Sequence, residues 1–171
     1  MKHDIILVDD DDQPIGTASK LEVHQNGWLH RAFSIFLFNN KGELLLQQRA
    51  HDKYHSSGLW TNTCCSHPCP GELTELAAVR RLNEEMGIVT TLEYPFSIKY
   101  FVSFDNGLIE NEFDHVFIGT SDSLPQINKN EVASWKYISI AELKTDIKKN
   151  PFFYTEWFKI LVGKISEKVI L

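Results

Sequence analysis

One amphipathic segment, residues 73–86, constrains the fold of this chain more than any other feature. Its apolar side chains recur at helical spacing, and they are Leu73, Leu76, Ala77, Val79, Leu82 and Met86. Gly87 follows at once and predicts the end of the helix, because glycine readily takes the positive φ that closes many helices. Strand-like runs lie on both sides of this helix, so the chain is neither all helical nor all strand.

Short apolar runs bounded by turn residues predict the strands. They cover Asp4–Val8, Ala32–Phe38, Glu43–Gln48, Leu59–Cys65, Phe96–Phe104, Leu108–Gly119 and Val132–Ile138. Residues 39–42 and 105–107 predict hairpin turns, whereas 9–16 are expected to form a turn and 51–58 a polar loop. Two further helices are expected over 139–148 and 155–169. This order predicts an α+β fold in which helices flank mixed β-sheets.

The composition fits a single domain over residues 1–171, since 43% of the residues are hydrophobic and 23% are charged. The formal net charge of −6 argues against nucleic acid as a partner, because such binding depends on a basic surface. No apolar run reaches the roughly 18 residues that a membrane span needs, and the acidic N-terminal segment differs from a signal peptide. We therefore expect a cytoplasmic protein that binds neither nucleic acid nor membrane.

The stretch TNTCCSHPCPGE, residues 61–72, holds all three cysteines, Cys64, Cys65 and Cys69. A disulfide within it would close too short a loop to constrain the unfolded chain. A structural zinc site normally draws a second ligand pair from elsewhere, and no second cysteine pair exists. Side chains alternate along an extended segment, so Cys64 and Cys65 point to opposite faces and Cys65 shares its face with His67. The alternative is that the cysteines are small buried apolar side chains.

Glu110 and Glu112 form a second same-face pair, in the sequence LIENEFDHVF. Their like charges repel each other, and a metal ion is the most economical partner that would relieve the repulsion. The alternative is a strand that shows its polar edge to water.

Two histidines, His24 and His30, stand too far apart for one helical turn but converge if the chain bends at Gly27. Each alone is more often a surface or core residue than a ligand. A mixed donor set would result from the combination of His24, His30, His67, Glu110 and Glu112. Such a set suits Zn, Mn or Fe at five or six coordination, although spacing alone leaves open whether the side chains meet.

Residues 66–88, SHPCPGELTELAAVRRLNEEMGI, resemble a degenerate Nudix box, G-x5-E-x7-R-E-U-x-E-E-x-G-U, where U is a bulky aliphatic residue. The matching positions are Glu72, Arg80, Leu82, Glu84, Glu85, Gly87 and Ile88. Ser66 replaces the first glycine, and Arg81 replaces the glutamate of the R-E pair. Because Nudix hydrolases gather Mg²⁺ with these glutamates, Arg81 makes the box poorly suited to hydrolysis, although it still suits the binding of a diphosphate.

The wider chain resembles the type 1 isopentenyl diphosphate isomerases, a branch of the Nudix superfamily. The matching stretches are GTASKLEVH, LHRAFSIFLFN, GLWTNTCCSHP, the box, GLIENE and PFFYTEW. The resemblance implies a Nudix-like α+β fold and the isomerisation of isopentenyl to dimethylallyl diphosphate through a tertiary carbocation, in isoprenoid biosynthesis. A Nudix diphosphohydrolase acting on a nucleotide or a prenyl diphosphate is the alternative.

The resemblance also implies roles for individual residues. It assigns a first divalent metal, Mn²⁺, Zn²⁺ or Mg²⁺, to His24, His30, His67, Glu110 and Glu112. It assigns a Mg²⁺ ion that bridges to the substrate diphosphate to Glu85 and the backbone carbonyl of Cys65. The diphosphate contacts fall to Lys20, Arg49, Lys53, Ser66 and Arg81. The expected partner is this small-molecule substrate, and the expected assembly is a monomer or homodimer.

Around the hydrocarbon, the resemblance places Cys65, Glu112, Tyr100 and Trp157. Glu112, hydrogen-bonded by Tyr100, is expected to supply a proton, and Cys65 on the opposite side is expected to take one. The indole face of Trp157 is expected to stabilise the cation by roughly 2 kcal/mol or more when desolvated. The alternative is that Trp157 is an ordinary core residue. No role is predicted for Cys64, Cys69, His51 or His55.

Overall fold

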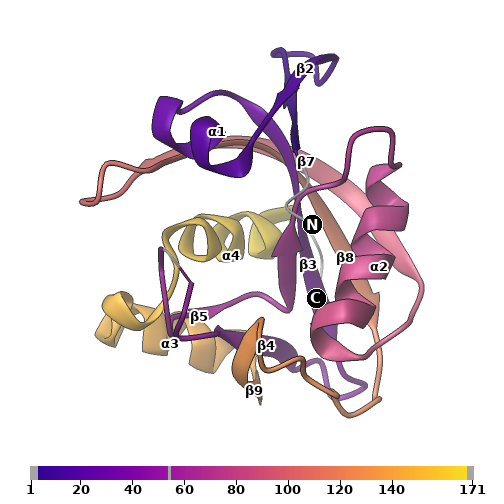
Figure 1. Ribbon diagram of the computed structural model, residues 1–171. Helices are drawn as coiled ribbons and strands as arrows, with labels where there is room; N and C mark the ends of the chain where they lie inside the picture. The colour runs from indigo at the N-terminus through magenta and orange to yellow at the C-terminus, as the bar shows by residue number, and fades with distance from the viewer. Residues whose placement is uncertain (1–3, 54, 169–171) are drawn as a thin grey trace.

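The computed structural model describes residues 4–53 and 55–168, and their nine strands form one mixed sheet with helices against both faces (Figure 1). The strands are β1 (Ile5–Val8), β2 (Pro14–Ala18), β3 (His30–Phe38), β4 (Leu44–Arg49), β5 (Trp60–Thr61), β6 (Cys64–Ser66), β7 (Leu92–Ser103), β8 (Ile109–Thr120) and β9 (Val132–Ile138). The helices are α1 (Lys20–Asn26), α2 (Thr74–Met86), α3 (Ile140–Lys149), the short 3₁₀ helix η1 (Pro151–Phe153) and α4 (Glu156–Lys168). Within this part of the chain, no helix is long and apolar enough to cross a membrane.

Strand β3 lies at the centre of the molecule and is almost entirely buried. Its side chains alternate between two apolar clusters, because successive residues of a strand point to opposite faces. Phe33, Ile35 and Leu37 pack in the cluster that contains α2, whereas Phe36 and Phe38 pack in the cluster that contains α4. Figure 1 shows α2 and α4 on either side of β3 and β8. A strand covered on both faces needs a nearly continuous apolar sequence, which β3 has.

The strand pairing brings distant segments together. β3 and β8 pair in parallel, with His30 opposite Glu112, while the other named strand pairs are antiparallel. β8 also pairs with β7, where Tyr100 lies opposite Glu112. β6 pairs with β3, where Cys65 lies opposite Ser34. The sheet register therefore gathers an imidazole, a carboxyl group, a phenol and a thiol into one region.

The structure confirms the α+β class and the seven predicted strands, although the run 59–65 divides into β5 and β6. One prediction was wrong: residues 14–16, expected in a turn, begin β2. This strand is mostly exposed and so lacks the apolar alternation that reveals a half-buried strand, and its proline occupies the first position, where strands tolerate one. The strands on either side of the predicted hairpin turn at 39–42 pair at only one position, Phe38 with Leu44. Beyond it, β4 pairs chiefly with β9.

Helix α1 is absent from the sequence prediction because its seven residues are too few to show hydrophobic periodicity. Its signals are local ones. Ser19 and Glu22 form a reciprocal capping box at the N-terminus. Gly27 ends the helix at φ 64°, and a side chain there would lie 3.0 Å from Ile109, so both the backbone angle and the space require glycine. The bend expected at this position is present.

The other helices agree with the prediction to within about a residue at most ends. Gly87 follows α2 with φ 66°, as the sequence predicted. Residue 169, the last of the predicted helix 155–169, lies outside the described residues.

Candidate active site

The cysteine cluster follows the expected alternation. Cys64 is fully buried in the apolar cluster on the α2 side, whereas Cys65 packs against the cluster on the α4 side. Cys65 and His67 line the same small cavity. Cys69 instead accepts a contact of 3.7 Å from the guanidinium of Arg80. Because the three free thiols point in three directions, neither a disulfide nor a zinc knuckle forms here.

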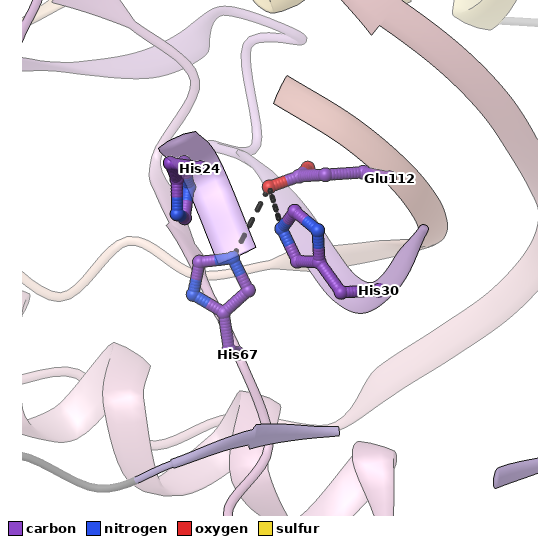
Figure 2. Close-up of side chains that lie close together, drawn as sticks. All are labelled: His24, His30, His67 and Glu112. Carbon is purple, nitrogen blue, oxygen red and sulfur yellow. Dashed lines mark hydrogen bonds and ion pairs between the residues drawn. The ribbon is translucent and has the colours of Figure 1, made fainter. Parts of the chain in front are cut away.

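Three imidazoles and two carboxylates converge beside that cavity. The ring centres of His24 and His67 each lie 5.1 Å from that of His30. Oε1 of Glu112 lies 3.2 Å from Nε2 of His67 and 3.5 Å from Nε2 of His30. Oε2 of Glu110 lies 3.1 Å from Nε2 of His24. Figure 2 shows His30 and His67 directed at one oxygen of Glu112, with His24 beside them. The structure thus brings together the five side chains that sequence spacing could not place.

Backbone carbonyls fix which nitrogen of each ring faces the cluster. Nδ1 of His24 lies 2.6 Å from the carbonyl oxygen of Lys20, and Nδ1 of His30 lies 2.9 Å from that of Trp28. A carbonyl oxygen only accepts, so each Nδ1 carries a proton and donates it. In the neutral ring this leaves the lone pair on Nε2, directed at the cluster, which is the usual arrangement of a metal-binding histidine.

Burial and close partners set the protonation of the cluster. Burial lowers the pKa of His67 to about 3, so this ring is neutral at neutral pH. Burial also lowers the pKa of His30, but the hydrogen bond with Glu112 and the charges of Glu112 and Glu110 together outweigh burial and raise this pKa. Burial raises the pKa of Glu110, and the charge of Glu112 raises it further. For Glu112, burial acts in the same direction, yet hydrogen bonds from His30 and His67 hold its pKa well below the usual value.

This donor set fits a divalent cation. His24, His30, His67 and Glu112 each offer one ligand atom, and these atoms lie within 4.8 Å of one another. Glu110 adds an oxygen on the side of His24. Imidazole nitrogen combined with carboxylate oxygen suits Mn²⁺, Zn²⁺ or Fe²⁺. A cation here would also neutralise the two carboxylates that this cluster buries.

A cavity of about 40 Å³ opens beside this cluster. Its walls contain the four side chains assigned to the hydrocarbon, Cys65, Tyr100, Glu112 and Trp157. One water needs roughly 10–15 Å³, so the cavity holds only a small group. Tyr100 donates a hydrogen bond to Oε2 of Glu112, the oxygen that faces away from His67. Burial raises the pKa of Cys65 to about 12, so the thiol is protonated at neutral pH.

Trp157 is both a core residue and part of the cavity wall. It is 3% exposed and packs in the apolar cluster of α4, and it also lines the cavity. The guanidinium of Arg49 lies 5.3 Å from the centre of its ring. The indole face therefore already attracts one cation.

A second cavity of about 280 Å³ shares four wall residues with the first, and these are Lys20, Arg49, Cys65 and Ser66. It contains every residue predicted to contact a diphosphate, together with the predicted magnesium ligand Glu85. Burial lowers the pKa of Lys20, and the charges of Arg49 and Lys53 lower it further, although Glu110 opposes them. Cations thus gather locally in a chain whose net charge is −6.

Glu85 is buried at the base of this second cavity between two donors. Gln47 donates from Nε2 to its Oε2 at 2.9 Å, and Arg81 donates from Nη2 to its Oε1 at 2.6 Å. Arg81, which stands where the Nudix box has a glutamate, therefore pairs with two of the remaining box carboxylates, Glu84 and Glu85. This exchange replaces one anionic metal ligand with a cation suited to phosphate oxygens.

Sequence interpretation missed four residues of the site. Asp114 continues the same-face series of β8 and accepts a hydrogen bond of 2.8 Å from Ser34, so strand alternation alone would have revealed it. The second and third, Gln47 and Glu131, line the second cavity. There Glu131 pairs with Lys53 and approaches Arg81. The fourth, His55, comes from a polar loop without periodicity.

Comparison with known proteins agrees with this fold. A family model for the NUDIX domain matches residues 28–158. The crystal structure of DR0079 from Deinococcus radiodurans aligns with a TM-score of 0.78 at 18% identity, covering 94% of this chain and 98% of that one. A MutT protein from Methanosarcina mazei aligns with a TM-score of 0.69 at 15% identity, covering 84% of this chain and 96% of that one. The fold and the box therefore define a Nudix protein.

Curated relatives define the branch. Isopentenyl-diphosphate Delta-isomerase 2 of Photorhabdus laumondii is 52% identical over 97% of this chain and 94% of its own length. Isopentenyl-diphosphate Delta-isomerase of Pectobacterium atrosepticum is 49% identical over 96% of this chain and 92% of its own length. The chain belongs to the isopentenyl-diphosphate Delta-isomerase family. The predicted resemblance is confirmed, and the diphosphohydrolase alternative is not favoured.

Proposed function

We propose that the protein isomerises isopentenyl diphosphate to dimethylallyl diphosphate, the reaction for which its relatives are named. The observation that carries this proposal is the shared cavity of Cys65 and Glu112, which adjoins a second, cation-lined cavity. The reaction adds a proton at one end of an allylic unit and removes another at the other end. It therefore needs an acid and a base that face a small slot with little room for water.

The larger cavity binds the diphosphate. Lys20, Arg49, Lys53, Ser66 and Arg81 supply the cations and the hydroxyl group. The His–Glu cluster would hold a divalent ion that would polarise Glu112, and Glu85 with the carbonyl of Cys65 would hold Mg²⁺, which would neutralise charge on the diphosphate. Anchoring at this charged end positions five carbons in the smaller cavity, so binding energy from a remote group serves the reaction.

Glu112 and Cys65 carry out the proton transfers. The carboxyl of Glu112, held through Oε2 by Tyr100, protonates the terminal alkene carbon and leaves a tertiary carbocation. Cys65 then accepts a proton from C2, and the electron pair of that C–H bond forms the new double bond. Burial raises the pKa of Cys65 to about 12, although the charge of Arg49 favours the thiolate. The resting thiol must therefore first pass its proton to the Glu112 carboxylate. Each turnover then moves one proton from Glu112 back to Cys65, so the two transfers balance.

The remaining wall of the slot protects the cation. Trp157 presents an indole face, which stabilises positive charge without forming a bond. Tyr100 is tied to Glu112, and burial raises the pKa of its phenol well above the usual value, so no phenolate is present to trap the intermediate.

The proposal is tested by incubating the metal-loaded protein with isopentenyl diphosphate in deuterated water. Deuterium is expected at the new methyl group and at C2 of the allylic product, without release of inorganic phosphate. Cys65→Ala is expected to abolish the exchange, whereas Cys69→Ala, a thiol outside the cavity, retains it. Phosphate release without an allylic product would identify a diphosphohydrolase and contradict the proposal.

A further inference from the structure

A fourth imidazole, that of His55, lies against the metal-binding cluster. It belongs to the loop between β4 and β5, is 6% exposed, and lines the smaller cavity. Its Nε2 lies 3.3 Å from Oε1 of Glu110, and its ring centre lies 6.0 Å from that of His24. One ligand atom from each of these three residues lies within 4.8 Å of the others.

The two oxygens of Glu110 face different partners. Oε2 lies 3.1 Å from Nε2 of His24 and 3.9 Å from that of His30, so it faces the ring nitrogens of the cluster. Oε1 faces His55 instead. His55 and Glu110 share one group of ligand atoms with His24, and neither belongs to the larger group that contains Glu112. Because Oε2 of Glu110 faces His24 and His30 while Oε1 faces His55, His55 lies on the oxygen of Glu110 that is turned away from those two rings.

The partners of the two ring nitrogens of His55 indicate which nitrogen carries the proton. A carboxylate oxygen only accepts, so Nε2, 3.3 Å from Oε1 of Glu110, is the nitrogen placed to donate. Nδ1 lies 3.4 Å from Oγ of Ser56, whose hydroxyl is able to donate to it. One donor and one acceptor nitrogen describe a neutral imidazole in a single tautomer.

Both the backbone and the ring of His55 are held in place. Arg49 donates from Nη2 to the backbone oxygen of His55 and from Nε to that of Ser56, each at 3.2 Å. The ring stacks on Phe104 with centres 5.3 Å apart and planes 25° apart, and it meets Trp157 edge-on at 5.9 Å and 79°. A donor fixed in this way gives the carboxylate it bonds a fixed orientation.

We propose that His55 is a positioning residue of the metal centre, which donates from Nε2 to Oε1 of Glu110 and thereby aims Oε2 at the metal ion. Its ring also closes the cavity beside Trp157. This inference rests on the metal site of the proposed function. Partners that orient a metal ligand typically change metal affinity by about 10–100-fold when removed.

The test is titration of Mn²⁺ into metal-stripped, full-length protein by calorimetry. His55→Leu removes the donor and is expected to weaken binding by about 10–100-fold. His55→Gln retains a side-chain donor and is expected to stay within a few-fold of the unmodified protein. His51→Leu, an exposed histidine of the same loop, is the matched control and is expected to bind normally. Unaltered binding by His55→Leu, or equal weakening by the leucine and glutamine variants, overturns the proposal.

A second measurement requires no substitution. Pulsed electron paramagnetic resonance counts the imidazole nitrogens coupled to Mn²⁺ in the unmodified protein. Three are expected from His24, His30 and His67, whereas four would make His55 a direct ligand and overturn the positioning role. If the unmodified protein binds no Mn²⁺ at all, the metal site itself fails and this inference fails with it. That result differs from a loss confined to the His55 variants.

Discussion

The acidic side chains of the Nudix box, residues 66–88, and those of β8 lie in one fold but have different kinds of partner. Three of those in the box pair with arginines, and they are Glu72, Glu84 and Glu85. Those of β8 are buried among imidazoles, a phenol and a hydroxyl group, and they are Glu110, Glu112 and Asp114. Arg80 lowers the pKa of Glu72 to about 2, whereas burial and the charge of Glu112 raise the pKa of Asp114 well above its usual value.

The two groups of carboxylates suit two different roles. Carboxylates that are neutralised by arginines stay ionised and hold a helix or a charged ligand in place. Carboxylates in a dry, crowded strand have displaced pKa values, which suits metal binding and proton transfer. On the proposed function, the Nudix box of this chain would serve architecture and the diphosphate, and the proton chemistry would belong to β8.

The largest expected effect comes from substituting one carboxylate of β8, compared with the same substitution in the Nudix box. Glu112→Gln removes the proton donor and is expected to lower kcat for isomerisation by about 10²–10⁴-fold. Glu84→Gln, on the exposed side of α2, is expected to leave kcat within about two-fold because Glu84 lines neither cavity and its ion pairs with Arg80 and Arg81 are partly exposed. Steady-state kinetics with isopentenyl diphosphate measures both. Equal losses in the two variants would remove the distinction between the strands and the box.

Metal binding should stabilise the protein through β8 and not through the box. Mn²⁺ at about 100 times its Kd adds about 2.7 kcal/mol to the free energy of unfolding. For a chain of this length, that corresponds to a rise in Tm of about 5–10 °C. Differential scanning calorimetry is expected to show this rise in the unmodified protein and to lose it in His67→Ala. A chelator that unfolds the protein outright would instead indicate a structural metal site.

Arg81 is expected to act on diphosphate binding and not on proton transfer. Arg81→Ala removes charged hydrogen bonds worth about 1.5–3 kcal/mol, so KM for isopentenyl diphosphate should rise by about 10–100-fold with a smaller change in kcat. Arg80→Ala is the control, since its guanidinium binds Glu72 and Glu84 outside the cavity. A fall in kcat with an unchanged KM for Arg81→Ala would contradict this division.

The smallest effect concerns the stability that Glu72 gives to the start of α2. Its pKa falls from 4.5 to about 2, because Arg80 donates a hydrogen bond to it. This stability is present above about pH 4.5 and is lost as the pH falls toward 2. Glu72→Gln is expected to cost about 1 kcal/mol at neutral pH, since the pair is partly exposed. Urea denaturation at several pH values should show the two proteins converge in acid, and Glu75→Gln should show no such trend.

Hydrophobic periodicity predicted the features that depend on which face of a helix or strand is buried. The helix of residues 73–86 and the shared face of Cys65 and His67 both followed from it, as did the shared face of Glu110 and Glu112. Assignment of those residues to a reaction came from the family resemblance, because spacing alone left a polar strand edge equally open.

The elements and residues that sequence analysis missed lack hydrophobic periodicity. Strand β2 is exposed, and α1 is too short for a hydrophobic repeat, although its capping box was visible at Ser19. The parallel alignment of β3 with β8 depends on packing across the whole sheet. His55 enters the site through a loop whose path is set by Arg49, so no repeat or spacing predicts it.

The parallel ladder between β3 and β8 makes metal uptake a late reporter of folding. A slip of one residue would set His30 against Asn111 or Phe113 and turn the β8 carboxylates to the other face. Parallel ladders close long chain loops, which is slow and follows local structure. Mn²⁺ added during refolding should therefore bind only to molecules that have completed this strand pairing. The rate of Mn²⁺ binding would then report the rate of the last folding step.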